Sequence, residues 1–155
     1  MTATRRALCC WILPLLSCGR ARPKPDFTGT WKLNLAKSKL EITPPESSVF
    51  YIDHQEPRFR LKRTHVFNGK PNTRAIELTV GGPEVVQKDG TADFHARLRR
   101  DGEVLVFDSY WIDGSSKATN IVRYTLSKNR AVFTADERLT APDVQHHNIW
   151  VFDRQ

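Results

Sequence analysis

The sequence predicts an all-β domain, an antiparallel up-and-down meander of about eight or nine strands that closes into a barrel. Turn signals recur along the chain, and stretches rich in Val, Ile, Thr and aromatic residues separate them. Within these stretches apolar and polar residues alternate, which gives the sheet one apolar face. Closing the sheet into a barrel buries that face and removes the sheet edges. The 155 residues, 39% hydrophobic and 26% charged, have the composition of a single globular domain.

We expect strands near residues 27–33, 48–54, 58–67, 73–80, 91–100, 103–112, 118–127, 130–140 and 146–153. Gly- and Asn-containing turns separate most of them, such as Asn68-Gly69, Asp89-Gly90 and Asp113-Gly114. Only residues 35–40 (LAKSKL) suggest a helix, and it is short. The absence of repeats and of alternating helices argues against a repeat array and a βαβ fold.

Two hairpin turns predict which side chains point into the barrel, because residues paired across a hairpin share one side of the sheet. With Asp101-Gly102 as a two-residue loop, Leu98 pairs with Leu105 and Ala96 pairs with Phe107. The side chains expected inside on this second strand are Leu105, Phe107, Ser109 and Trp111, and those expected outside on the first are His95, Arg97 and Arg99.

The second readable hairpin has Lys128-Asn129 as its loop. Tyr124 then pairs with Phe133, and Asn120 pairs with Glu137, all four pointing inward. The inward face is therefore apolar but interrupted by a few polar groups.

The first residues of the chain are typical of an export signal. Residues 1–6 carry two arginines and no acid, and residues 7–16 (ALCCWILPLL) form an apolar run too short for a permanent transmembrane helix. The following Leu-Ser-Cys-Gly resembles the lipobox of bacterial lipoproteins, which makes Cys18 the candidate lipidation site. We expect a signal peptide at 1–18, a linker at 19–25 and the barrel domain at 26–155. The protein would then be a lipoprotein of the periplasm or outer membrane; the alternative is free secretion after cleavage near Ala21.

The first predicted strand carries a known sequence signature. Residues 27–33 (FTGTWKL) resemble the Gly-x-Trp motif that opens lipocalins, fatty-acid-binding proteins and avidins, together called calycins, with Gly29 and Trp31 as the matching residues. The resemblance implies that Trp31 plugs one end of the barrel, often beneath an arginine from a late strand. Arg138 and Arg154 are both candidates for that arginine.

Three further stretches are similar to small secreted bacterial lipocalin-like proteins, most of which have no assigned activity. They are residues 34–39 (NLAKSK), 124–127 (YTLS) and 151–155 (VFDRQ). The long helix of many lipocalins and the helical lid of fatty-acid-binding proteins are missing, so the resemblance implies no ligand class.

A barrel of this size holds either packed side chains or one small ligand. An apolar wall with a few convergent polar groups suits a hydrophobic or amphipathic molecule, and Arg63 or His65 would meet its carboxylate. The predicted ligand-binding residues are Arg63, His65, Phe107, Ser109, Trp111, Asn120, Tyr124, Phe133 and Glu137. The alternatives are an internal ion pair between Arg63 and Glu137, or a face assignment that is wrong by one residue.

The outer surface suggests a second, non-enzymatic function. The chain has a net charge of +7, and the basic residues expected outside are Arg58, Arg60, Lys62, Arg97 and Arg99. Such a surface could dock a structural or adaptor module on an anionic membrane.

Several classes of function receive no support from the sequence. Motifs for hydrolases, phosphate binding, dinucleotide binding and nucleic-acid binding are absent, so no catalytic residue, cofactor or nucleic-acid partner is predicted. No metal site is predicted either, because adjacent His146 and His147 point to opposite faces of a strand. No cysteine follows Cys18, which excludes a disulfide within the barrel. The oligomeric state is not predicted.

Overall fold

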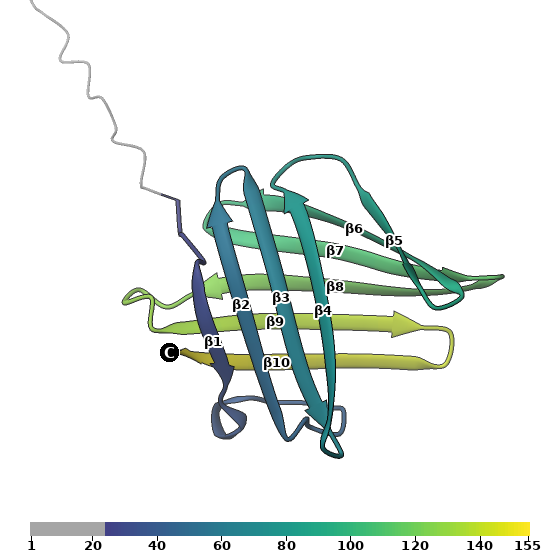
Figure 1. Ribbon diagram of the computed structural model, residues 1–155, viewed down its shortest axis with the longest axis horizontal. Coiled ribbons are helices and arrows are strands. Elements are labelled where there is room, and N and C mark those ends of the chain that lie inside the picture. The colour runs from purple at the N-terminus through teal and green to yellow at the C-terminus, as the bar shows by residue number, and fades with distance from the viewer. Residues whose placement is uncertain (1–23) are drawn as a thin grey trace, which may run out of the picture.

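The computed structural model describes residues 24–155, so the predicted signal peptide and its Cys18 lie outside the described residues. These residues form one ten-stranded antiparallel sheet that curls into a nearly closed barrel (Figure 1). The strands are β1 (Gly29–Leu33), β2 (Ser47–Gln55), β3 (Arg58–Phe67), β4 (Lys70–Thr79), β5 (Val85–Asp89), β6 (Ala92–Asp101), β7 (Val104–Asp113), β8 (Ser116–Leu126), β9 (Val132–Ala141) and β10 (Val144–Arg154).

The first and last strands lie side by side. Strand β1 pairs with both β2 and β10, so the sheet runs in the order β4-β3-β2-β1-β10-β9-β8-β7-β6-β5. Its two ends, β4 and β5, do not pair with each other; we call the gap between them the seam. At one end of the seam, a parallel bridge between Val80 and Leu98 brings the two halves of the sheet together.

The predicted meander is confirmed, with ten strands instead of eight or nine. The missed strand is β5, whose residues (VVQKD) are mostly exposed and lack the alternating pattern that marks a half-buried strand. The expected helix at 35–40 is a single 3₁₀ turn, Leu35–Lys37 (η1). No helix within residues 24–155 is long and apolar enough to cross a membrane.

The register of the first analysed hairpin differs from the prediction by two residues. Asp101 pairs with Val104, so the loop is Gly102-Glu103 and Leu98 lies opposite Phe107 instead of Leu105. Gly102 has φ +60° and is the first loop residue, the position where type II′ turns require a positive φ. A shift of two residues keeps every side chain on its side of the sheet, so the predicted faces survive the error.

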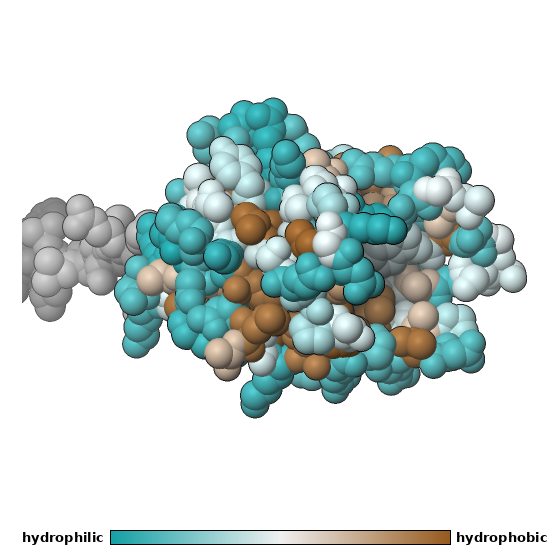
Figure 2. Space-filling model, turned by 60° about the horizontal axis from the view of Figure 1, so that its bottom comes forward, coloured by the Kyte–Doolittle hydropathy of each residue, from teal (hydrophilic) through white to brown (hydrophobic). Residues whose placement is uncertain are grey.

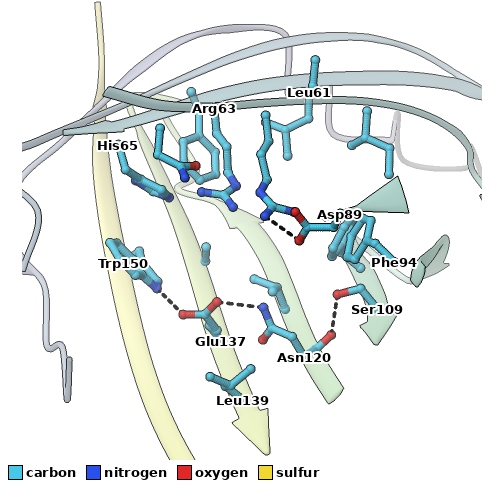
Figure 3. A pocket seen from close by; sticks show the side chains of 18 of the residues that line it. Leu61, Arg63, His65, Asp89, Phe94, Ser109, Asn120, Glu137, Leu139 and Trp150 are labelled. Atoms are coloured by element: carbon cyan, nitrogen blue, oxygen red, sulfur yellow. Dashed lines mark hydrogen bonds and ion pairs between the residues drawn. The ribbon is translucent and has the colours of Figure 1, made fainter. Parts of the chain in front are cut away.

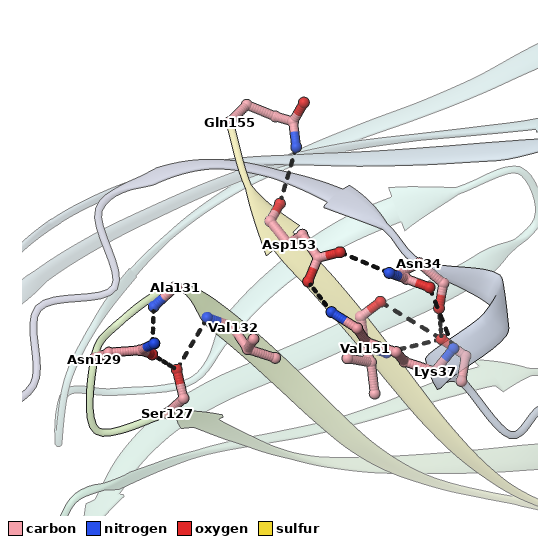
Figure 4. Close-up of polar contacts among 10 residues, drawn as sticks. Asn34, Lys37, Ser127, Asn129, Ala131, Val132, Val151, Asp153 and Gln155 are labelled. Atoms are coloured by element: carbon pink, nitrogen blue, oxygen red, sulfur yellow. Dashed lines mark hydrogen bonds and ion pairs between the residues drawn. The ribbon is translucent and has the colours of Figure 1, made fainter.

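The second hairpin shows the same displacement for a different reason. Leu126 pairs with Phe133 and Asn120 pairs with Leu139, which leaves a five-residue loop at 127–131 instead of Lys128-Asn129. The side-chain oxygen of Asn129 accepts hydrogen bonds from the Ser127 hydroxyl at 2.7 Å and from the backbone N–H of residue 131 at 3.2 Å (Figure 4). These local bonds stabilise a wider loop than the two-residue turn assumed from the sequence.

One end of the barrel is filled by aromatic side chains. Trp31 is fully buried, lies 5.5 Å from Phe133 between ring centroids, and donates its indole N–H to the carbonyl of Phe27 at 3.0 Å. Arg154 lies over the Trp31 ring at 4.2 Å and donates to the carbonyls of Thr28 at 2.8 Å and Arg130 at 2.9 Å. Arg154 is thus the arginine that the resemblance implied, and the exposed Arg138 is not.

Candidate binding cavity

The other end of the barrel contains a cavity of about 670 Å³. Its location follows from the inward residues, which change along each strand. On β9 they run from Phe133 through Ala135 to Glu137, and on β10 from Phe152 through Trp150 to Asn148. Bulky aromatic groups therefore fill one end, while smaller and polar groups leave space at the other. The volume falls within the range of small-molecule sites, about 300–1,000 Å³.

The structure brings eight of the nine predicted ligand-binding residues to this cavity. Further apolar residues line it together with Arg63, His65, Phe107, Ser109, Trp111, Asn120, Tyr124 and Glu137. Figure 3 shows five of these eight with labels: Arg63, His65, Ser109, Asn120 and Glu137. Phe133 does not line it: the ring is fully buried and packs against Trp31 and Phe27 at the closed end. The two-residue error in register explains this misplacement, because Tyr124 lies opposite Ala135 and not opposite Phe133.

Arg63, on β3, places a guanidinium in the cavity. None of the ion pairs or hydrogen bonds found among residues 24–155 involves it, and the sequence-level alternative of an Arg63–Glu137 ion pair is not formed. Burial, reinforced by nearby Arg74, lowers the pKa of Arg63 below the ordinary arginine value. An arginine remains protonated in proteins, so the cavity contains a positive charge that no carboxylate of residues 24–155 neutralises by direct contact.

His65 lies two residues further along β3 and is held between aromatic rings. It stacks on Trp150 at 5.6 Å and meets Phe50 edge-on at 5.9 Å. Burial, with a contribution from the charge of Arg63, lowers the pKa of His65 to about 4. The imidazole is therefore neutral at pH 7, and Arg63 is the cation available to an anionic ligand, not His65.

Glu137 faces the cavity from the opposite wall. Its carboxylate accepts N–H groups from Asn120 at 2.9 Å, Asn148 at 3.0 Å and the Trp150 indole at 2.7 Å. All three donors are neutral, so they fix the position of the carboxylate without cancelling its charge. The neighbouring Tyr124 side chain is buried, and this burial, together with the charge of Glu137, raises the pKa of Tyr124.

A polar contact crosses the seam at the edge of the cavity. Arg74 on β4 forms an ion pair with Asp89 on β5 at 2.5 Å, and Asp89 also accepts the Trp111 indole N–H at 3.0 Å (Figure 3). The contact with Arg74 lowers the pKa of Asp89. Neither charged residue was predicted from the sequence, because β5 was not predicted and no local motif indicated that it meets β4.

The predicted basic exterior is largely balanced by acids. Arg58 lies 3.4 Å from Asp53, Arg60 pairs with Glu77 at 2.7 Å, and Arg97 and Arg99 share Asp108 at 3.6 and 3.1 Å. Lys62 makes none of the ion pairs found in the described part of the chain. On the face seen in Figure 2, hydrophilic residues surround a central group of hydrophobic ones.

Within residues 24–155, no three or more His, Cys, Asp or Glu side chains gather in a way that could hold a metal ion.

Comparison with known proteins finds similar structures but no similar sequence. No protein-family model and no characterised protein sequence matches the chain. Secretory abundant heat soluble protein 4 from Ramazzottius varieornatus has a similar structure, with a TM-score of 0.57 and 14% identity over 83% of this chain and 94% of its own.

Two ligand-binding proteins also have structures similar to this chain, with slightly lower TM-scores. A fatty-acid-binding protein from Schistosoma mansoni, solved with arachidonic acid, has a TM-score of 0.52 and 13% identity, covering 83% of this chain and 96% of its own. The zebrafish ileal bile-acid-binding protein, solved with cholic acid, has a TM-score of 0.54 and 12% identity, covering 83% and 98%. At these identities the likeness shows the fold, which is a calycin-like barrel as the Gly29 and Trp31 signature implied.

Proposed function

We propose that this calycin-like barrel binds an amphipathic small molecule whose apolar part fills the cavity and whose anionic group contacts Arg63. The observation that carries the proposal is the Arg63 guanidinium, which faces a cavity of about 670 Å³ without a carboxylate partner among residues 24–155. Leaving a buried charge unpaired is costly, and a ligand anion would remove that cost. Two barrels of the same fold were solved with acids bound, arachidonic acid and cholic acid, which supports this ligand class.

The proposal is tested by titrating the purified protein with oleate while following displacement of a fluorescent hydrophobic anion. We expect saturable binding that Arg63→Gln weakens about 10- to 100-fold, since a hydrogen bond to a charged group contributes about 1.5–3 kcal/mol. The matched control is Lys62→Gln, which removes an exposed positive charge from the preceding residue of the same strand. Equal affinities for the two variants, or no saturable binding by the wild-type protein, would refute the assignment.

The second candidate function, docking of the basic outer surface on an anionic membrane, has less support. Four of its five residues lie within 4.0 Å of a carboxylate, which reduces the charge available to a phosphate surface. Sedimentation with phosphatidylglycerol vesicles at low salt tests this function. Loss of binding on combined Arg97→Gln and Arg99→Gln substitution would favour it.

We also propose that the protein is exported and anchored by a lipid on Cys18. This proposal rests on residues 1–18 alone, with their basic start, short apolar run and lipobox-like Leu-Ser-Cys-Gly. Incorporation of labelled palmitate in the native host, and its loss in Cys18→Ala, is the expected result. Labelling that persists in that variant would refute lipidation at this residue.

A further inference from the structure

The cavity carries a second unpaired charge that a simple fatty acid would not use. Glu137 lies on β9, and its carboxylate is half-buried in the cavity wall facing Arg63 on β3 (Figure 3). A carboxylate in this position repels a ligand that offers only a negative group. Its presence needs a reason beyond recognition of an acid.

The hydrogen bonds of Glu137 leave one acceptor position open. A carboxylate offers about four lone-pair sites, two on each oxygen. Oε2 accepts from Asn148 at 3.0 Å and from Trp150 at 2.7 Å, whereas Oε1 accepts from a single donor in the described part of the chain, Asn120 at 2.9 Å. One site on Oε1 therefore stays free to accept a hydrogen bond from a molecule in the cavity.

The same hydrogen bonds keep Glu137 from moving to Arg63. Donors from β8 and β10 hold the carboxylate against the wall that these strands form, opposite β3. Glu137 and Arg63 therefore form no ion pair at 4.0 Å or less. The cavity is therefore dipolar, with a cation on one wall and an anchored acceptor on the other. A preorganised polar group of this kind selects ligands that match it, because a ligand without the matching group leaves the protein group unsatisfied.

Building on the proposed function, we infer that the ligand is an amphipathic acid with a hydrogen-bond donor, a hydroxyl or an ammonium group, placed to reach Glu137 while the acid contacts Arg63. The Oε1 acceptor specifies a donor on the ligand, and the charge of the carboxylate strengthens the bond. The donor distinguishes this class from unsubstituted fatty acids, which satisfy Arg63 alone.

Matched pairs of lipids provide the test. The affinity of stearic acid is compared with those of 3-hydroxystearic and 12-hydroxystearic acid, and the affinity of lysophosphatidylcholine is compared with that of lysophosphatidylethanolamine, which adds ammonium N–H donors. We expect the donor-bearing member of at least one pair to bind at least tenfold more tightly. The pair that shows the preference identifies the donor as a hydroxyl or an ammonium group.

Glu137→Gln then tests whether this residue accepts the hydrogen bond from the donor group of the ligand. The variant keeps the shape of the side chain, and Asn120 can rotate its amide to accept from the new NH₂ group, since its Oδ1 is buried without a partner among the described residues. We expect the preference for the donor-bearing lipid to fall at least fivefold while binding of stearic acid tightens. The control is Asp136→Asn, which alters the outward-facing neighbour that pairs with His147.

The possible results separate this inference from the proposed function. Binding of all acids without any preference for a donor, unchanged by Glu137→Gln, refutes the inference and leaves Arg63 recognition intact. Failure of every lipid to bind refutes both. Thermal unfolding of each variant shows whether a lost preference reflects a lost fold.

Discussion

Replacing Arg154 with alanine should destabilise the barrel without changing the cavity. Arg154 donates two hydrogen bonds to backbone carbonyls, at 2.8 and 2.9 Å, and covers the Trp31 ring at 4.2 Å. Each hydrogen bond contributes about 1 kcal/mol and an exposed cation–π contact about 0.5–1 kcal/mol. Because the side chain is partly solvated and water can replace it at the carbonyls, we expect a loss of about 2 kcal/mol.

For a domain of this size, about 2 kcal/mol corresponds to a decrease in Tm of about 6–10 °C. The assay is urea unfolding followed by tryptophan fluorescence, with ligand affinity measured in parallel. The control is Arg123→Ala, which removes a solvent-exposed ion pair with Asp101 and should cost well under about 1 kcal/mol. If Arg154→Ala costs no more than this control, the arginine does not stabilise the closed end and the reasoning is wrong.

Three further predictions follow from other contacts. Gly29→Ala should destabilise the fold about as much as Arg154→Ala, because the added Cβ would lie 2.6 Å from the Arg154 guanidinium; urea unfolding of the double variant should show a clearly non-additive loss. Asp89→Asn should weaken the contact with Arg74 across the seam and increase both association and dissociation rates of a hydrophobic dye up to about fivefold, measured by stopped-flow fluorescence; unchanged rates would show that the seam is not the route of access. The pKa of His65 is about 4 in the folded protein against an ordinary 6.5, so the unfolded state binds the proton more tightly. Stability should therefore decrease as pH falls from about 6.5 to about 4, and His65→Gln should remove that part of the pH dependence in acid unfolding curves.

The sequence predicted which face of the sheet each side chain occupies better than it predicted the register between paired strands. Alternation fixes which residues share a face, so the interior positions of Arg63, His65 and Glu137 follow from the sequence. Register depends on loop geometry, and both hairpins were displaced by two residues because the turns at Gly102 and at 127–131 differ from those assumed. An even displacement preserves faces, which is why the cavity lining survived the error.

Positions along the barrel axis were not predictable from the sequence. Phe133 and Glu137 point to the same interior, yet one belongs to the packed end and the other to the cavity. Their distribution depends on how far each strand is offset from its neighbours as the sheet closes, which no local pattern encodes. The charged contact across the seam was not predicted because β5 itself was not predicted.

The pairing of β1 with β10 also determines how the barrel folds. Arg154 and Thr28 are in contact although they are separated by 126 residues in the sequence. Apart from this join and the isolated bridges Lys39–Ile149 and Val80–Leu98, the sheet consists of pairs of consecutive strands. The loop that this contact closes is the longest in the sheet and has the largest single loop-closure entropy, and high contact order slows folding. A circular permutant that joins β10 to β1 and opens the chain at residues 80–84 would run from β5 to β4 as one continuous meander, turning this most distant contact into a local one.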